Sequence, residues 1–366
     1  MTWLGLEGHD AIVDRFRGTL RAGRLASSYL FVGPEGCGKR SFALRLAQSL
    51  LCEQAASAEG GAAELSPCGQ CEGCQQVLAG THPDVLSVAK PEDKKDIPVK
   101  LLIGDPEHRG REGLCHDLSL KPFRGDRRIA ILDDADFLNE EGANCLLKTL
   151  EEPPPRSVLI LVGTSAEKQL PTIRSRCQIV HFRPLPVDVA SRLLVSTGVA
   201  GSLEQAEPLA RCAEGSLTRA SILADESLWK FRGELFGSLA HLPSGAVRFS
   251  KAITSCVESV GKEAPLRRAR ATLLVNFAIE YYHRLMRAHV AAESGTALNE
   301  DGNDPDLARA VEAGLGNWQG DVEAITRAVD RCLEAGSHVE RNANLATLVE
   351  CWISDLVELS RQKAVC

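Results

Sequence analysis

A glycine-rich segment at residues 33–39, Gly-Pro-Glu-Gly-Cys-Gly-Lys, constrains the fold of this chain more than any other feature. It matches the pattern G-x-x-x-x-G-K, follows an apolar run at residues 28–32 and precedes a helical pattern at residues 39–51. Glycines let backbone N–H groups turn toward phosphate oxygens, and a helix N-terminus and a lysine add positive potential. This context favours a phosphate loop over a chance glycine turn. The predicted phosphate-binding residues are Gly33, Gly36, Gly38 and Lys39.

Two further apolar runs, at residues 129–132 and 158–162, have the pattern of buried strands. The first ends in Asp133 and Asp134, and the second is followed closely by Thr164. Buried strands separated by helices indicate a parallel α/β sheet that binds ligands at the carboxyl edge of its strands. The two aspartates stand where a carboxylate pair holds magnesium and polarises water. The alternative is a solvated acidic strand end.

The residue that normally ligates magnesium is missing from the loop. A Ser or Thr is expected after Lys39, and the sequence has Arg40 there instead. Ser41 is one residue further, about 100° around the helix, and is expected to point away. The sequence therefore predicts a phosphate cradle without its metal ligand.

Cysteines form one group with metal-ligand spacing. Cys68, Cys71 and Cys74 are three residues apart, and Cys52 precedes them by sixteen positions. Four thiolates suit a structural, tetrahedral zinc ion. A ferredoxin-type run would continue with a cysteine where the chain has Leu78, which makes an iron–sulfur cluster the weaker alternative, beside unligated thiols. The other nine of the thirteen cysteines show no ligand spacing.

The length of 366 residues predicts about two to three domains. Prolines at 184 and 186 mark the end of the first, an α/β domain at residues 1–186 with an inserted zinc module at 52–74. A small helical domain at 187–228 and an all-helical domain at 229–366 follow. Apolar residues at helical spacing in the last domain indicate core or an oligomer interface.

Charge and hydropathy exclude some classes of function. With 42 basic and 49 acidic residues the net charge is −7, which argues against a general polyanion binder. No apolar run approaches a membrane span and the N-terminus lacks signal-peptide features, so we expect a cytoplasmic location without membrane contact. One basic stretch stands out, and it either faces DNA or forms a solvated surface. Its residues are Arg109, Arg111, Lys121, Arg124, Arg127 and Arg128.

Four motifs occur in the order found in the bacterial clamp-loader AAA+ proteins of DNA polymerase III, which the chain resembles. They are Cys-Gly-Gln-Cys-Glu-Gly-Cys (68–74), Gly-Thr-His-Pro-Asp (80–84), Leu-Leu-Lys-Thr-Leu-Glu-Glu-Pro-Pro (146–154) and Ser-Arg-Cys (175–177). The resemblance covers about residues 1–228 strongly. It continues weakly to the segment at 341–346, which is similar to a part of the family's collar domain. It implies an AAA+ domain, a helical lid and an α-helical collar.

The resemblance also implies roles for single residues. Members form a pentameric ring that opens a sliding clamp, with ATP at subunit boundaries. Arg176 matches the arginine finger that reaches a neighbour's ATP, unless it is simply a salt-bridged arginine. Thr164 matches a sensor residue. The lid motif normally places an arginine where this chain has Thr218, with Arg219 one position late.

Three departures, at Arg40, Asp134 (where the family usually has Glu) and Thr218, predict a subunit of the DNA polymerase III holoenzyme without its own ATPase activity. Its loop either retains ATP passively or no longer binds it. The implied partners are the delta and tau/gamma subunits, with the sliding clamp and primed DNA reached through the complex. The alternative is an ATP-hydrolysing motor subunit of tau/gamma type. An independent zinc-dependent nucleic-acid module is disfavoured by the acidic charge and by the lack of interleaved aromatic and basic residues.

Overall fold

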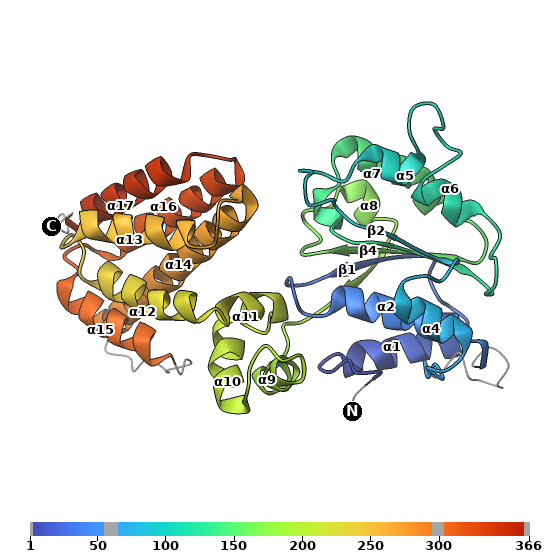
Figure 1. Cartoon of the computed structure of the whole chain (residues 1–366), viewed down its shortest axis with the longest axis horizontal. Helices are drawn as coiled ribbons and strands as arrows, with labels where there is room; N and C mark the ends of the chain where they lie inside the picture. The colour runs from blue at the N-terminus through green and yellow to red at the C-terminus, as the bar shows by residue number, and fades with distance from the viewer. Residues whose placement is uncertain (1–2, 55–64, 295–303, 362–366) are drawn as a thin grey trace. The chain divides into compact units, whose positions relative to one another are not determined.

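The computed structural model describes residues 3–54, 65–294 and 304–361. The predicted zinc module therefore lies partly outside the described residues. The chain divides into two compact units (Figure 1). The first comprises Met1–Gly198 and Ala213–Ala220, and the second comprises Val199–Cys212 and Ser221–Cys366. The sequence predicts three domains, with limits at 187 and 229. This division into two units does not test those limits, which remain predictions.

The first unit contains a five-stranded parallel sheet with the order β2-β3-β4-β1-β5. The three central strands, β1 (Ser28–Val32), β3 (Arg128–Leu132) and β4 (Ser157–Gly163), are almost completely buried and confirm the predicted apolar runs. The edge strands β2 (Val85–Val88) and β5 (Gln178–His181) were not predicted. Both are short and carry a polar residue, so the periodicity signal is weak.

Helices cover both faces of this sheet (Figure 1). Phe16 of α1 (Asp10–Arg21) and Phe42 of α2 (Lys39–Leu50) pack with Phe31 of β1 on one face, where α4 (Glu72–Ala79) also lies. On the other face Leu30 of β1 shares a core with Leu146 of α7. The helices of that face are α5 (Val99–Ile103), α6 (Leu114–Ser119), α7 (Glu140–Glu151) and α8 (Pro171–Arg174). Alternate strand residues thus face opposite layers, as a doubly covered sheet requires.

The second unit is helical throughout its described residues. The described part of the chain thus has the predicted fold class, a parallel α/β domain followed by helices. Helix α9 (Val187–Ser196) belongs to the first unit, and α11 (Leu217–Leu223) spans the division at residue 220. The helices of the second unit are α10 (Leu203–Cys212), α12 (Glu226–Ala240), α13 (Ala246–Glu258), α14 (Ala264–Ser294), α15 (Pro305–Asn317), α16 (Val322–Glu340) and α17 (Leu345–Arg361).

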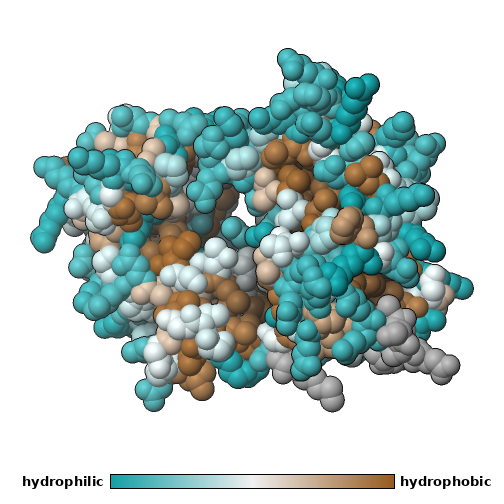
Figure 2. Space-filling view, turned by 45° about the vertical axis from the view of Figure 1, so that its right-hand side comes forward, coloured by the Kyte–Doolittle hydropathy of each residue, from teal (hydrophilic) through white to brown (hydrophobic). Residues whose placement is uncertain are grey.

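The apolar stripes of this unit are core. Phe277 and Tyr281 of α14 and Trp352 of α17 are buried. Leu266 lies at the exposed start of α14. None of the described helices combines the length and apolarity needed to cross a bilayer. The face in Figure 2 is largely hydrophilic, with separate apolar patches.

Candidate nucleotide and metal sites

A cavity of about 520 Å³ lies at the carboxyl edge of the sheet. The loop after β1, the aspartates after β3 and Thr164 after β4 converge there because these three strands are neighbours and parallel. Of the predicted nucleotide-site residues, Gly36, Gly38, Lys39, Asp133, Asp134 and Thr164 line the cavity. Gly33 lies at the start of the loop and donates its N–H to the Thr164 carbonyl over 3.1 Å.

Two loop glycines are required by close packing. Gly33 has φ +154°, and a β-carbon there would lie 2.4 Å from the Phe182 carbonyl oxygen. Gly36 has φ +70°, and its β-carbon would lie 2.6 Å from both Ser216 Oγ and Thr218 N. The Gly36 carbonyl also accepts a hydrogen bond from Leu217 N at 3.1 Å. Side chains at either position would push the loop out of place.

Lys39 is buried and turned onto its own loop. Its Nζ donates to the carbonyl oxygens of Gly33 (2.7 Å) and Pro34 (2.6 Å). His9 also contacts the loop: its Nε2 lies 2.7 Å from the Cys37 carbonyl oxygen, so it is the protonated nitrogen and donates. Burial lowers the pKa of His9 and favours this neutral ring. Sequence reasoning missed His9, which lies far from any motif.

Arg40 occupies the side of the cavity where a magnesium ligand is expected. Its Nε lies 3.3 Å from Asp133 Oδ2. Burial, together with repulsion from Asp134, raises the pKa of Asp133 despite the nearby charges of Arg40 and Lys39. Ser41 is also among the residues that line the cavity. That its hydroxyl points away from the site stays a prediction.

Thr164 is held by a carboxylate that sequence reasoning missed. Its backbone N–H donates to Asp136 Oδ2 over 2.8 Å, and its hydroxyl donates to the same oxygen. Gln169 Nε2 donates to the other oxygen at 2.9 Å. A β-carbon at Gly163 would lie 2.6 Å from Asp136 Oδ1, so a side chain there would displace this carboxylate from Thr164. The signal available in the sequence was a third aspartate, two residues beyond the predicted pair.

The four predicted metal ligands come together beside α4. The sulfur atoms of Cys52, Cys68, Cys71 and Cys74 all lie within 4.8 Å of one another. Zinc–sulfur bonds of about 2.3 Å in a tetrahedron place sulfurs about 3.8 Å apart. The Cys68 and Cys74 sulfurs are 4.0 Å apart, so the group fits a closed tetrahedral metal site. Zinc as its occupant remains a prediction.

Backbone N–H groups point at these sulfurs. Cys68 N donates to Cys52 Sγ at 3.3 Å, and Cys71 N to Cys68 Sγ at 3.2 Å. The N–H groups of Cys71 and Gln70 lower the pKa of Cys68 to about 6, whereas burial raises that of Cys74. The cluster thus starts partly ionised, and metal binding would release the remaining protons.

Comparisons with known proteins agree with this architecture. Residues 8–186 match the family described as "DNA polymerase III, delta subunit". The delta' subunit of Pseudomonas aeruginosa is 38% identical over 45% of this chain and 45% of its own length. The Escherichia coli delta' subunit is 31% identical over 63% of this chain and 65% of its own length. Over these residues the chain is therefore similar to the clamp-loader subunits of DNA polymerase III.

A tau subunit is also similar to this chain. That of Escherichia coli is 30% identical over 64% of the chain and 34% of its own length. The chain spans less than two thirds of each of these three relatives.

Arg176 lies just after α8 and outside the cavity lining. Its side chain is 34% exposed, and Nη2 donates to Glu151 Oε1 at 2.6 Å while Nη1 donates to the Thr172 carbonyl at 3.0 Å. The salt-bridged arginine considered from the sequence is therefore present. An exposed ion pair is weak enough for another anion to compete for the guanidinium, so the role in trans remains a prediction.

The lid segment presents a threonine to the cavity. Leu217 and Thr218 line it, whereas Arg219 is absent from the lining and faces Glu214 at 3.5 Å. The one-residue offset seen in the sequence thus directs the arginine elsewhere.

The motif at residues 80–84 holds the turn at residues 123–125 through hydrogen bonds to Asp84. Asp84 is fully buried and accepts backbone hydrogen bonds from Phe123 (2.6 Å), Arg124 (2.8 Å) and Gly125 (2.9 Å). Burial alone would raise the pKa of Asp84, but these donors and Arg128 hold it below its usual value.

Replacing Asp84 with Asn is expected to destabilise the protein by about 2–4 kcal/mol, because an amide cannot accept all of these bonds and leaves Arg128 unpaired. Because the folded-state pKa of Asp84 is lowered, its contribution exists above the unfolded value of about 3.9 and disappears as pH falls through the folded value. Urea unfolding at pH 7 and pH 3 measures both effects. Equal losses of stability at the two pH values would contradict this account.

Three of the six residues of the basic stretch pair with carboxylates. Arg124 contacts Glu53 (3.0 Å) and Glu72 (2.5 Å), and Arg128 lies 3.5 Å from buried Asp84. Arg109 faces Glu141 at 3.5 Å. These pairs favour the solvated surface over a DNA-binding face.

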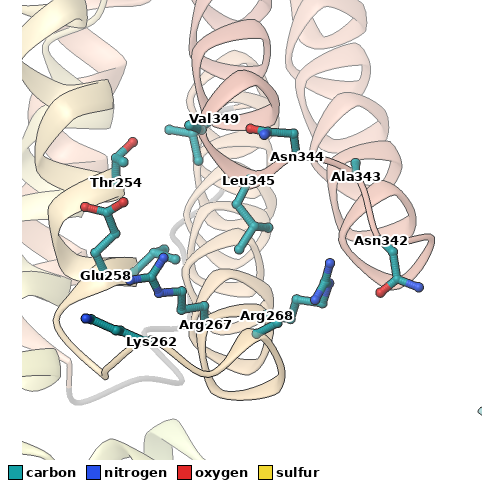
Figure 3. A pocket seen from close by; sticks show the side chains of 13 residues that line it. Thr254, Glu258, Lys262, Arg267, Arg268, Asn342, Ala343, Asn344, Leu345 and Val349 are labelled. Atoms are coloured by element: carbon teal, nitrogen blue, oxygen red, sulfur yellow. The ribbon is translucent and has the colours of Figure 1, made fainter. Parts of the chain in front are cut away.

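A second cavity, of about 480 Å³, lies in the helical unit at the segment similar to the collar (Figure 3). Leu345, the first residue of α17, points toward Arg267 across it, and Asn344 immediately precedes this helix. Lys262 and Arg267 line the loop side, and Arg267 Nε donates to the Gly261 carbonyl at 2.6 Å. The cavity contains no group of residues with a recognisable catalytic pattern.

Proposed function

We propose that this chain is a delta'-type subunit of the DNA polymerase III clamp loader that does not hydrolyse ATP itself. In this role it helps to load the sliding clamp onto primed DNA and supplies Arg176 to the ATP site of a neighbouring subunit. Its partners are the delta and tau/gamma subunits, and it acts in the cytoplasm. The zinc ion held by Cys52, Cys68, Cys71 and Cys74 is structural.

The contact between Arg40 and Asp133 carries this proposal. Phosphoryl transfer at a phosphate loop normally needs a hydroxyl on magnesium and an acidic residue free to assist. Here the position of the hydroxyl holds a guanidinium, and that cation lies 3.3 Å from the acidic residue. Asp134 adds support because its side chain is one methylene shorter than the usual Glu. Thr218 in place of the lid arginine points the same way.

The alternative function is that of an ATP-hydrolysing motor subunit of tau/gamma type, which the similarity to a tau subunit supports. A motor would need a magnesium ligand, a second-position glutamate and a lid arginine in the cavity. The cavity instead presents Arg40, Asp134 and Thr218. The chain also carries His82-Pro-Asp84, which we do not expect in the motor subunit.

We expect the isolated full chain to release no phosphate from ATP with magnesium, with or without primed DNA. Phosphate release is measured beside Lys39→Ala, which separates contamination from activity of this site. Turnover that Lys39→Ala abolishes would establish the motor and refute the proposal. Co-purification with delta and tau/gamma subunits of the same organism tests assembly, and a chain that never joins them would also contradict it.

A further inference from the structure

We propose that the loop at residues 33–39 binds the polyphosphate tail of a nucleotide without a divalent cation, with Arg40 supplying the positive charge that magnesium supplies elsewhere. The inference rests on the proposed non-hydrolysing role and adds a ligand class and a binding mode to it. It also assigns a role to Arg40, which would otherwise be only the residue that replaces a metal ligand.

The first step is that the anion cradle is kept. Gly33, Gly36 and Gly38 have positive φ values, and packing against Phe182 and Ser216 holds the first two in place. Gly38 caps α2 without a side-chain hydrogen bond, so first-turn N–H groups stay available for an anion. Lys39 Nζ already lies at the loop, where it donates to two backbone carbonyl oxygens. Phosphate oxygens can replace these carbonyls as acceptors.

The second step concerns charge. The Arg40 side chain is 56% exposed and lines the cavity. A guanidinium has five N–H donors in a planar fork, and the contact through Nε to Asp133 leaves others free to meet phosphate oxygens. Asp133 thereby orients the Arg40 guanidinium. In a phosphate loop that binds magnesium, the same carboxylate would help to hold the metal.

The third step concerns the metal itself. Magnesium requires near-octahedral oxygen ligands and gives up water reluctantly. At this site Asp133 already pairs with Arg40, and the charge of Arg40 would repel a second cation. Ser41 offers the only neighbouring hydroxyl of α2 in the cavity lining, so it is the alternative metal ligand to exclude.

The test is a titration of the full chain with a fluorescent ATP analogue, once in EDTA and once in magnesium. We expect saturable binding with equal affinity in both, competed by inorganic tripolyphosphate. Absence of binding in EDTA would overturn the proposal. Tighter binding in magnesium than in EDTA would also overturn it. If the Ser41→Ala variant lost that gain in affinity, the Ser41 hydroxyl would be the metal ligand.

Variants assign the effect to Arg40. Arg40→Ser is expected to weaken binding in EDTA by about tenfold or more, and magnesium should then restore part of the affinity. Lys39→Ala should abolish binding in both buffers. Unchanged affinity of Arg40→Ser in EDTA would refute the role of Arg40. The wild-type comparison needs no variant, so a poorly folded Arg40→Ser still leaves a decisive result. None of these measurements involves assembly or turnover, so failure here is distinct from failure of the proposed function.

Discussion

Replacing Arg176 with Ala in the reconstituted complex is expected to silence the one ATP site that this subunit borders. An arginine supplied in trans stabilises charge on the transferred phosphoryl group and contributes about 10³ to 10⁵ in rate. Total DNA-stimulated turnover should fall only partly, because the other sites keep their own arginines. Clamp loading should fall further if it needs every site. Phosphate release and clamp loading are measured on complexes of confirmed stoichiometry.

Two controls separate this role from a structural one. Arg174→Ala removes a neighbouring exposed arginine of α8 and should leave turnover unchanged. Glu151→Gln removes the partner of Arg176 but keeps the guanidinium, so it should retain turnover. Arg176→Lys should not restore the rate, since an ammonium lacks the planar fork. Normal turnover and loading with Arg176→Ala would show that the ion pair to Glu151 is its whole function.

Replacing Cys71 with Ala is expected to remove the metal and much of the stability of the first unit. The wild-type chain should contain about one zinc ion, since four thiolates close the site. Loss of one ligand opens the coordination shell, and binding energy at structural zinc sites is folding energy, about 10–16 kcal/mol in small zinc peptides. Elemental analysis and thermal unfolding measure the two effects.

The matched control is Cys351→Ala, which removes an exposed cysteine of α17 in the second unit. It should keep the zinc content and the melting temperature of the wild type. A metal-free wild-type chain with full stability would refute the zinc site. Iron in place of zinc would favour the iron–sulfur alternative.

Patterns with strong local rules predicted most of the site. The strands that precede Gly33, Asp133 and Thr164 are long apolar runs, so their burial and the meeting of their ends could be inferred. The sulfur ligands could be inferred from spacing, and Cys52 from its place just after the predicted phosphate-loop helix. Each of these inferences uses residues close in sequence or the general rule for parallel strands.

The missed residues depend on contacts between distant segments. His9 reaches the Cys37 carbonyl from a helix start that carries no motif. Asp136 holds Thr164 across two strand ends, and its position in a short 3-10 turn (Ala135–Phe137) has no periodic signature. Ser41 is among the residues that line the cavity, which helix geometry alone did not predict. Such details depend on tertiary packing, which a linear pattern does not contain.

Helix α2 connects the two candidate sites. Its first residue, Lys39, belongs to the phosphate loop, and Cys52 follows its last residue by two positions. Twelve residues span about 18 Å, so the cysteine cluster lies at the far end of the helix whose near end forms the predicted anion cradle. We therefore expect a metal bound by these cysteines to hold the far end of α2 in place, and removal of the metal to disturb the loop as well as the cluster.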